Sequence, residues 1–175
     1  MADFSELVLE LLKAGVLVTG EQRFMASGSA TNWRQEVLRV ITAGAREGVS
    51  VFRESPETTD DVLRSVFSSH GFSESEVPQL IAAIPASQDA DQVTCERLQY
   101  EFGSRLPMWV VYGPETRNYP GQWICRMRLT IPGDEPTGTI ILADTLDGVR
   151  ERLPRGLACL PRFASDPPGI IETWL

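Results

Sequence analysis

The sequence is poor in the residue types on which most catalytic and metal sites depend. Its 175 residues include one histidine, His70, and three widely separated cysteines, Cys95, Cys125 and Cys159. A structural zinc site needs about four closely spaced cysteine or histidine ligands, and a serine or cysteine nucleophile usually needs a nearby histidine base. An odd number of scattered cysteines also indicates a reducing compartment. We therefore expect no metal, no cofactor and no catalytic residues, and we interpret the chain as a non-enzyme.

Long apolar runs and phosphate-binding loops are missing as well. No run approaches the ~20 apolar residues of a membrane-spanning helix, and the N-terminus carries acids where a signal peptide carries positive charge. Neither G-x-x-x-x-G-K-[ST] nor a strand followed by G-x-G-x-x-G occurs. These absences predict a cytoplasmic protein that does not enter a membrane and does not cradle phosphates.

Positive charge is scarce in the first part of the chain. The net charge is −8, and residues 1–105 hold sixteen acids and nine bases, against eight and seven in residues 106–175. An acidic surface disfavours direct binding to nucleic acids and anionic membranes and favours a basic partner. Solubility is the simpler explanation of such a charge. On either interpretation, we expect the surplus carboxylates to face outward.

Helical spacing of apolar residues dominates the first part. Four helices are expected, beginning near Phe4, Asn32, Pro56 and Ser73, with Asn32 and Gln35 forming a capping box at the second. Two short extended segments, 16–19 and 49–52, separate helices, and the small polar residues of 21–30 predict a loop. Residues 92–102 fit a helix or a strand, and a helix is favoured because Asp89 and Asp91 are good N-caps.

The segment Gln122–Ile131 has the strongest alternation in the sequence. Its odd positions are apolar, whereas Arg126, Arg128 and Thr130 are polar, which predicts a strand with one face in a core. Further strands are expected at 109–112, 139–143, 157–160 and 170–174, with one helix between 144 and 153. The fold class is therefore α+β. A mostly helical part, residues 1–104, is expected to pack on an antiparallel sheet with one helix, residues 105–175, in the order β-β-β-α-β-β.

A series of short motifs runs through the second part. The matching positions are Val110–Tyr112, Tyr119–Gly121, Trp123, Arg126, Ala143–Leu146, Pro154–Leu157, Pro161-Arg162, Asp166-Pro167 and Glu172–Trp174. Over about residues 108–175 the chain resembles a group of small uncharacterised bacterial and phage proteins. The resemblance implies a fold and a bacterial or phage origin, and it implies no site residue. No family resemblance covers residues 1–104.

Two arginines share one face of the strand 122–131. Arg126 and Arg128, together with Arg117 and Tyr119 from the preceding loop, could bind a carboxylate or phosphate in bidentate fashion. The alternative is a solvated strand face in which these arginines pair with Glu172 or another acid across the sheet.

Three acids precede or begin the third expected helix. Glu54, Glu57 and Asp61 have the spacing i, i+3, i+7, so they would lie on one side of the helix if it starts early. They could form an acidic docking surface. The alternative is a solvated face whose acidic side chains are stabilised by the positive N-terminal end of the helix dipole.

These observations favour a binding protein over a catalyst. We expect an acidic inhibitor or immunity-type factor that occludes the basic surface of a protein partner, such as a toxin or a nucleic-acid-binding complex. A structural subunit of an assembly, or an enzyme acting on an anionic ligand near Arg117, Arg126 and Arg128, are the alternatives. The sequence leaves the oligomeric state open.

Overall fold

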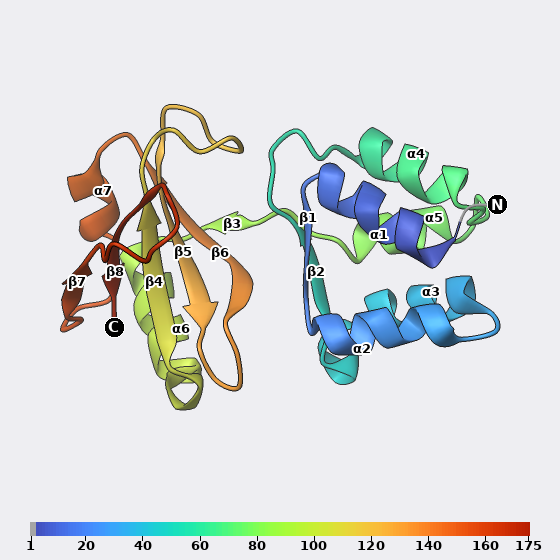
Figure 1. Ribbon diagram of the computed structural model, residues 1–175, viewed down its shortest axis with the longest axis horizontal. Coiled ribbons are helices and arrows are strands. Elements are labelled where there is room, and N and C mark those ends of the chain that lie inside the picture. Colours follow the sequence, from blue (N-terminus) through green and yellow to red (C-terminus); the bar gives the residue numbers. More distant parts are fainter. Residues whose placement is uncertain (1–2) are drawn as a thin grey trace. The chain divides into compact units, whose positions relative to one another are not determined.

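The computed structural model describes residues 3–175, which form two compact units (Figure 1). The first unit ends at Ala86 and the second begins at Ser87. The first combines helices with a two-stranded sheet, and the second combines a six-stranded sheet with two α-helices. The α+β fold class is therefore confirmed. Within the described residues, no helix is both long and apolar enough to cross a bilayer.

The first unit is mainly helical, as its apolar periodicity predicts. Its elements are α1 (Phe4–Lys13), β1 (Val16–Thr19), α2 (Glu21–Ala26), α3 (Trp33–Ala43), β2 (Ser50–Arg53), α4 (Asp60–Ser69) and α5 (Val77–Ala82), with 3₁₀ turns at Ser27–Ser29 and Gly44–Glu47. Strands β1 and β2 pair antiparallel. The helices bury one shared core, in which Leu7, Leu63 and Phe67 are fully enclosed.

Helix α2 lies where the sequence predicts a loop, and that prediction was wrong. The helix starts after Gly20, which has a positive φ of 74°, and it buries Phe24 in the core of the unit. A six-residue helix has little intrinsic stability. Tertiary packing of one phenylalanine therefore overrides the local composition of small and polar residues.

The expected capping box at α3 was also wrong. The Asn32 side chain makes no capping hydrogen bond, and Gln35 Nε2 donates instead to Glu76. A complete capping box is found at α1, where Asp3 accepts from the Glu6 N–H at 2.9 Å and Glu6 accepts from the Asp3 N–H at 3.3 Å.

The second unit is built on a sheet in the order β3-β6-β5-β4-β8-β7. Its elements are β3 (Gln88–Asp89), α6 (Gln92–Glu101), a 3₁₀ turn (Gly103–Arg105), β4 (Pro107–Tyr112), β5 (Trp123–Leu129), β6 (Glu135–Ala143), α7 (Leu146–Arg150), β7 (Cys159–Pro161) and β8 (Ile170–Trp174). All pairs from β4 to β8 are antiparallel. Within residues 107–174 the predicted order β-β-β-α-β-β is observed.

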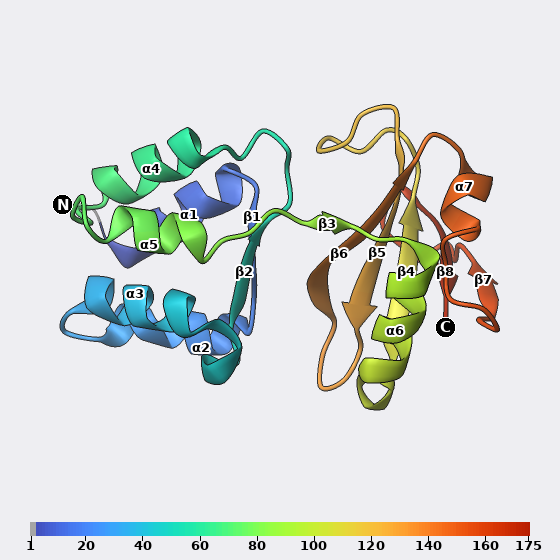
Figure 2. The ribbon, with the colours of Figure 1, turned by 180° about the vertical axis from the view of Figure 1, so that it is seen from behind.

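Helix α6 belongs to the second unit. The boundary between the units therefore lies earlier in the chain than the expected boundary between residues 104 and 105. Asp91 caps α6 by accepting from the Thr94 N–H at 2.8 Å, as the sequence suggested. The helix places Cys95 in the same core as Trp109 and Met127 of the sheet, and Figure 2 shows it lying across one sheet face.

Strand β5 is buried on both faces rather than on one. Its odd-numbered residues, including Cys125 and Met127, enter the core beneath α6, as the alternation predicts. On the opposite face, Ile124 and Arg126 each retain only 5% of their exposure. The polar positions of this strand therefore do not form the open, solvated face that their residue types suggested.

Candidate functional site

The predicted arginine pair lies on one face of β5, but its guanidinium groups are not openly displayed. Arg126 and Arg128 stand opposite Val110 and Met108 of β4. Arg126 is buried and donates through Nη1 to the Thr137 carbonyl at 3.3 Å. Arg117 is exposed in the β4–β5 loop and Tyr119 is partly buried there.

Arg128 is occupied by an acid of the adjacent turn. Its Nε lies 2.5 Å from Asp134 Oδ1, and its Nη2 donates to the Asp134 carbonyl at 3.4 Å. The hydroxyl of the partly buried Tyr112, whose pKa is raised by burial, also contacts this guanidinium. A carboxylate or phosphate would have to displace Asp134 in order to bind Arg128 in bidentate fashion.

The three acids Glu54, Glu57 and Asp61 do not share a helix face. Helix α4 begins at Asp60, and Thr59 caps it by accepting from the Val62 N–H at 3.3 Å. Glu54 and Glu57 therefore lie in the preceding loop, which corrects the expectation of an early helix start. The cause is the capping hydroxyl of Thr59, which fixes the first turn.

Glu57 and Asp61 nevertheless present their carboxylates to solvent. Both residues are exposed, and neither carboxylate forms an ion pair within residues 3–175. Asp60 between them pairs with Arg53 at 2.7 Å. Arg53 also donates to the Ile84 carbonyl at 2.8 Å, so its guanidinium group is already engaged by contacts within the first unit.

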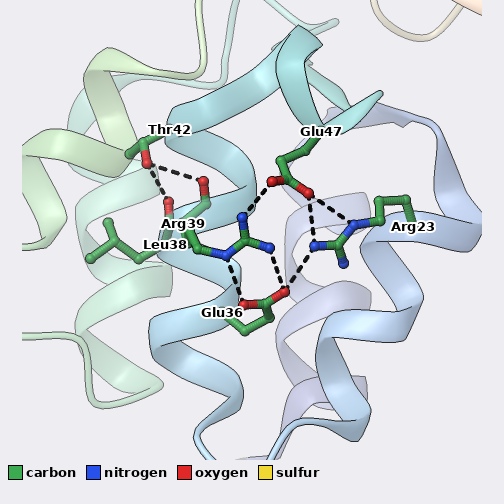
Figure 3. Close-up of polar contacts among 6 residues, drawn as sticks. All are labelled: Arg23, Glu36, Leu38, Arg39, Thr42 and Glu47. Atoms are coloured by element: carbon green, nitrogen blue, oxygen red, sulfur yellow. Dashed lines mark hydrogen bonds and ion pairs between the residues drawn. The ribbon is translucent and has the colours of Figure 1, made fainter.

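Four residues of the first unit form a closed square of alternating charge (Figure 3). Arg23 Nη2 lies 2.8 Å from Glu36 and 2.9 Å from Glu47, and Arg39 Nη2 lies 2.8 Å from Glu36. Arg39 Nη1 closes the square on Glu47. The four side chains come from α2, α3 and the 3₁₀ turn at 44–47, so the square joins three segments.

Electrostatics keep the square ionised. Hydrogen bonds from Arg39 and then Arg23 lower the pKa of Glu36 to about 2, and the same two bases lower the pKa of Glu47. The square carries no net charge, so it adds nothing to the net charge of the first unit. It also shows that Glu36 and Glu47, which the sequence counts toward the acidic surplus, are neutralised within the molecule.

A second ionic cluster surrounds Glu172, which the sequence suggested as one possible partner of Arg126 and Arg128. Arg150 of α7 binds Glu172 through Nε at 3.0 Å and Nη2 at 2.7 Å, so the partner is neither Arg126 nor Arg128. Trp174 Nε1 donates to the same carboxylate at 2.9 Å, and Cys159 Sγ lies 3.8 Å away. Residue 150 lies in a helix distant in sequence, so strand periodicity alone could not reveal this pair.

Burial distinguishes Glu172 from the other paired acids. Only 6% of its side chain is exposed, against 41% for Arg150. The bidentate bonds from Arg150 lower its pKa despite the burial, which acts in the opposite direction. These contacts link α7, β7 and β8, so the cluster has a structural role within the second unit.

The cysteines and the histidine occupy separate places. Cys95 and Cys125 are fully buried, and burial raises the pKa of the Cys95 thiol to about 12. His70 is the C-cap residue of α4, and its Nε2 lies 3.1 Å from Glu10 of α1. Within residues 3–175, no three histidine, cysteine, aspartate or glutamate residues are grouped so that they could hold a metal ion.

Comparison with known proteins adds no relative. No family model, no curated protein and no solved structure matches the chain.

Proposed function

We propose that the protein is a non-enzymatic acidic binding protein of bacterial or phage origin, which acts in the cytoplasm by occluding the basic surface of a protein partner. The observation that carries the proposal is the pair of exposed carboxylates, Glu57 and Asp61, at the start of α4. The nearby base Arg53 is bound to Asp60 and to backbone carbonyls. A basic partner would therefore meet two carboxylates that no cation of residues 3–175 neutralises.

The net negative charge of the first unit also supports binding to a basic partner. Residues 1–86 hold twelve acids and seven bases, and the neutral square takes up two of each, which leaves ten acids and five bases. Exposed charges of one sign accelerate association with a partner of opposite sign, and salt weakens that effect. The three cysteines are all free, which agrees with a reducing compartment.

The test compares two charge-matched variants in capture of partners from host extract. Glu57→Gln with Asp61→Asn removes the two carboxylates of the proposed surface. Glu21→Gln with Glu74→Gln removes two exposed carboxylates elsewhere in the same unit. At about 0.05 M salt, the first variant should lose a partner that the second retains, and about 0.3 M salt should weaken capture by the wild type. Equal behaviour of the two variants, or capture indifferent to salt, contradicts the proposal.

A further inference from the structure

The two edges of the six-stranded sheet differ in how their backbone hydrogen-bonding groups are satisfied. Beyond the end of β3, the backbone of Leu142 in β6 is satisfied by side chains. Its N–H donates to Asp89 Oδ1 at 3.2 Å, and its carbonyl accepts from Arg152 Nη1 at 2.6 Å. Asp89 and Arg152 are themselves an ion pair at 2.6 Å. This plug occupies the groups that another strand would otherwise use.

The opposite edge, at β7, has no such plug. Ala158 and Leu175 exchange both backbone hydrogen bonds, at 2.8 and 3.1 Å, so they form a hydrogen-bonded pair. Such pairs alternate with non-bonded pairs along antiparallel strands. The next pair, Cys159 and Trp174, is therefore non-bonded, and the N–H and C=O of Cys159 point away from β8. By the same alternation the carbonyl of Pro161 also points outward.

These outward groups are accessible and unused. Cys159 and Pro161 are exposed, and within residues 3–175 no hydrogen bond reaches the outward N–H or C=O of Cys159. Figures 1 and 2 both show β7 as the outermost strand of its sheet. The strand is short and ends in a proline, which lacks an N–H, so this edge can pair with a segment of only a few residues.

Basic side chains flank this edge. Arg155 precedes β7 with 83% of its side chain exposed, and its Nε forms an ion pair with Glu96 at 3.6 Å, a separation longer than that of a hydrogen bond. Arg162 follows β7 directly and is exposed. The nearest acid of the sheet, Glu172, is buried and bound to Arg150. The edge therefore offers main-chain hydrogen bonds between two exposed guanidinium groups.

We propose that the outer edge of β7 binds an extended acidic segment of a protein partner by strand addition. The Cys159 N–H and C=O and the Pro161 C=O supply the main-chain bonds, and Arg155 and Arg162 select acidic side chains at the two ends. This surface lies in the second unit and does not depend on the acidic surface at α4. Either proposal can fail without the other.

A capped peptide of about eight alternating glutamate and valine residues serves as the probe. Amide hydrogen exchange followed by NMR reports on the full-length protein. Saturating peptide should slow exchange of the Cys159 amide by about tenfold or more. The Ala158 amide, already bonded to Leu175, is the internal reference and should change less.

Three controls decide the outcome. The same peptide with N-methylated backbone and a lysine–valine peptide should both leave the Cys159 amide unprotected. Arg155→Glu with Arg162→Glu should weaken protection by the glutamate peptide, and both positions are exposed, so the fold should be retained. No protection at saturating peptide, or equal protection by the lysine peptide, overturns the proposal. Protection that rises with protein concentration alone would assign the edge to a second copy of this chain and would also overturn it.

Discussion

The two units use the same pair of residue types, arginine and glutamate, in contrasting ways. In residues 3–86, Arg23, Glu36, Arg39 and Glu47 share their bonds around a solvent-facing square. In residues 87–175, one carboxylate, Glu172, is withdrawn from water and satisfied by several donors. Exposed pairs are screened by solvent, whereas breaking a buried pair leaves polar groups unsatisfied. Environment, rather than residue type, therefore decides what each cluster contributes.

The largest expected effect follows from removing the buried carboxylate. Glu172→Ala leaves the Trp174 N–H and the Nε and Nη2 of Arg150 without their acceptor, whereas Arg150 Nη1 keeps its bond to Asp147. We expect the free energy of unfolding of the second unit to fall by about 2–3 kcal/mol, below the usual range for a broken buried pair because Arg150 can still reach water. Urea unfolding measures it. A decrease in the free energy of unfolding below about 0.5 kcal/mol would show that Glu172 contributes no more than a typical surface acid.

The pH dependence of stability should reveal the contribution of the buried carboxylate of Glu172. Hydrogen bonds from Arg150 lower the pKa of Glu172 in the folded state. A carboxyl group with a lowered folded pKa contributes its full stability above its unfolded pKa, about 4.3, and loses it as pH falls through the folded value. Thermal unfolding between pH 7 and pH 3 should therefore show a smaller acid-induced loss in Glu172→Gln than in the wild type. Parallel curves would remove Glu172 as a source of acid sensitivity.

The square should respond more weakly and should depend on salt. Glu36→Gln removes the negative charge that Arg23 and Arg39 share. We expect a smaller loss of stability than for Glu172→Ala, and one that decreases as salt rises, because all four side chains are partly exposed. Unfolding at two salt concentrations measures both features. An effect that matches Glu172→Ala and ignores salt would show that exposure does not set the difference.

The smallest effect concerns the thiol beside Glu172. Desolvation of the thiol and the neighbouring carboxylate raise the pKa of Cys159, so its thiolate fraction is low even though the residue is exposed. At pH 8, iodoacetamide should modify Cys159 more slowly than an unstructured cysteine peptide, as followed by mass spectrometry. A rate equal to that of the peptide would show that the carboxylate has no influence on the thiol.

The sequence was most informative where a pattern depends only on local geometry. The alternation in 122–131 located β5, and Asp91 marked the start of α6. Helix α2 was missed because its formation depends on burial of Phe24 against distant residues. The pairing of Glu172 with Arg150 was not predicted for the same reason, since Arg150 reaches Glu172 from a different element. Side-chain pairing across elements is a tertiary property that periodicity does not record.

The acidic surface at the start of α4 is tested most directly by titrating a captured partner with the two charge-matched variants. Isothermal titration at low salt should show that Glu57→Gln with Asp61→Asn weakens binding about fivefold, as expected for two screened surface charges. Glu21→Gln with Glu74→Gln should leave the Kd unchanged. If both variants weaken binding equally, only the net charge matters, and the proposed role of Glu57 and Asp61 is contradicted.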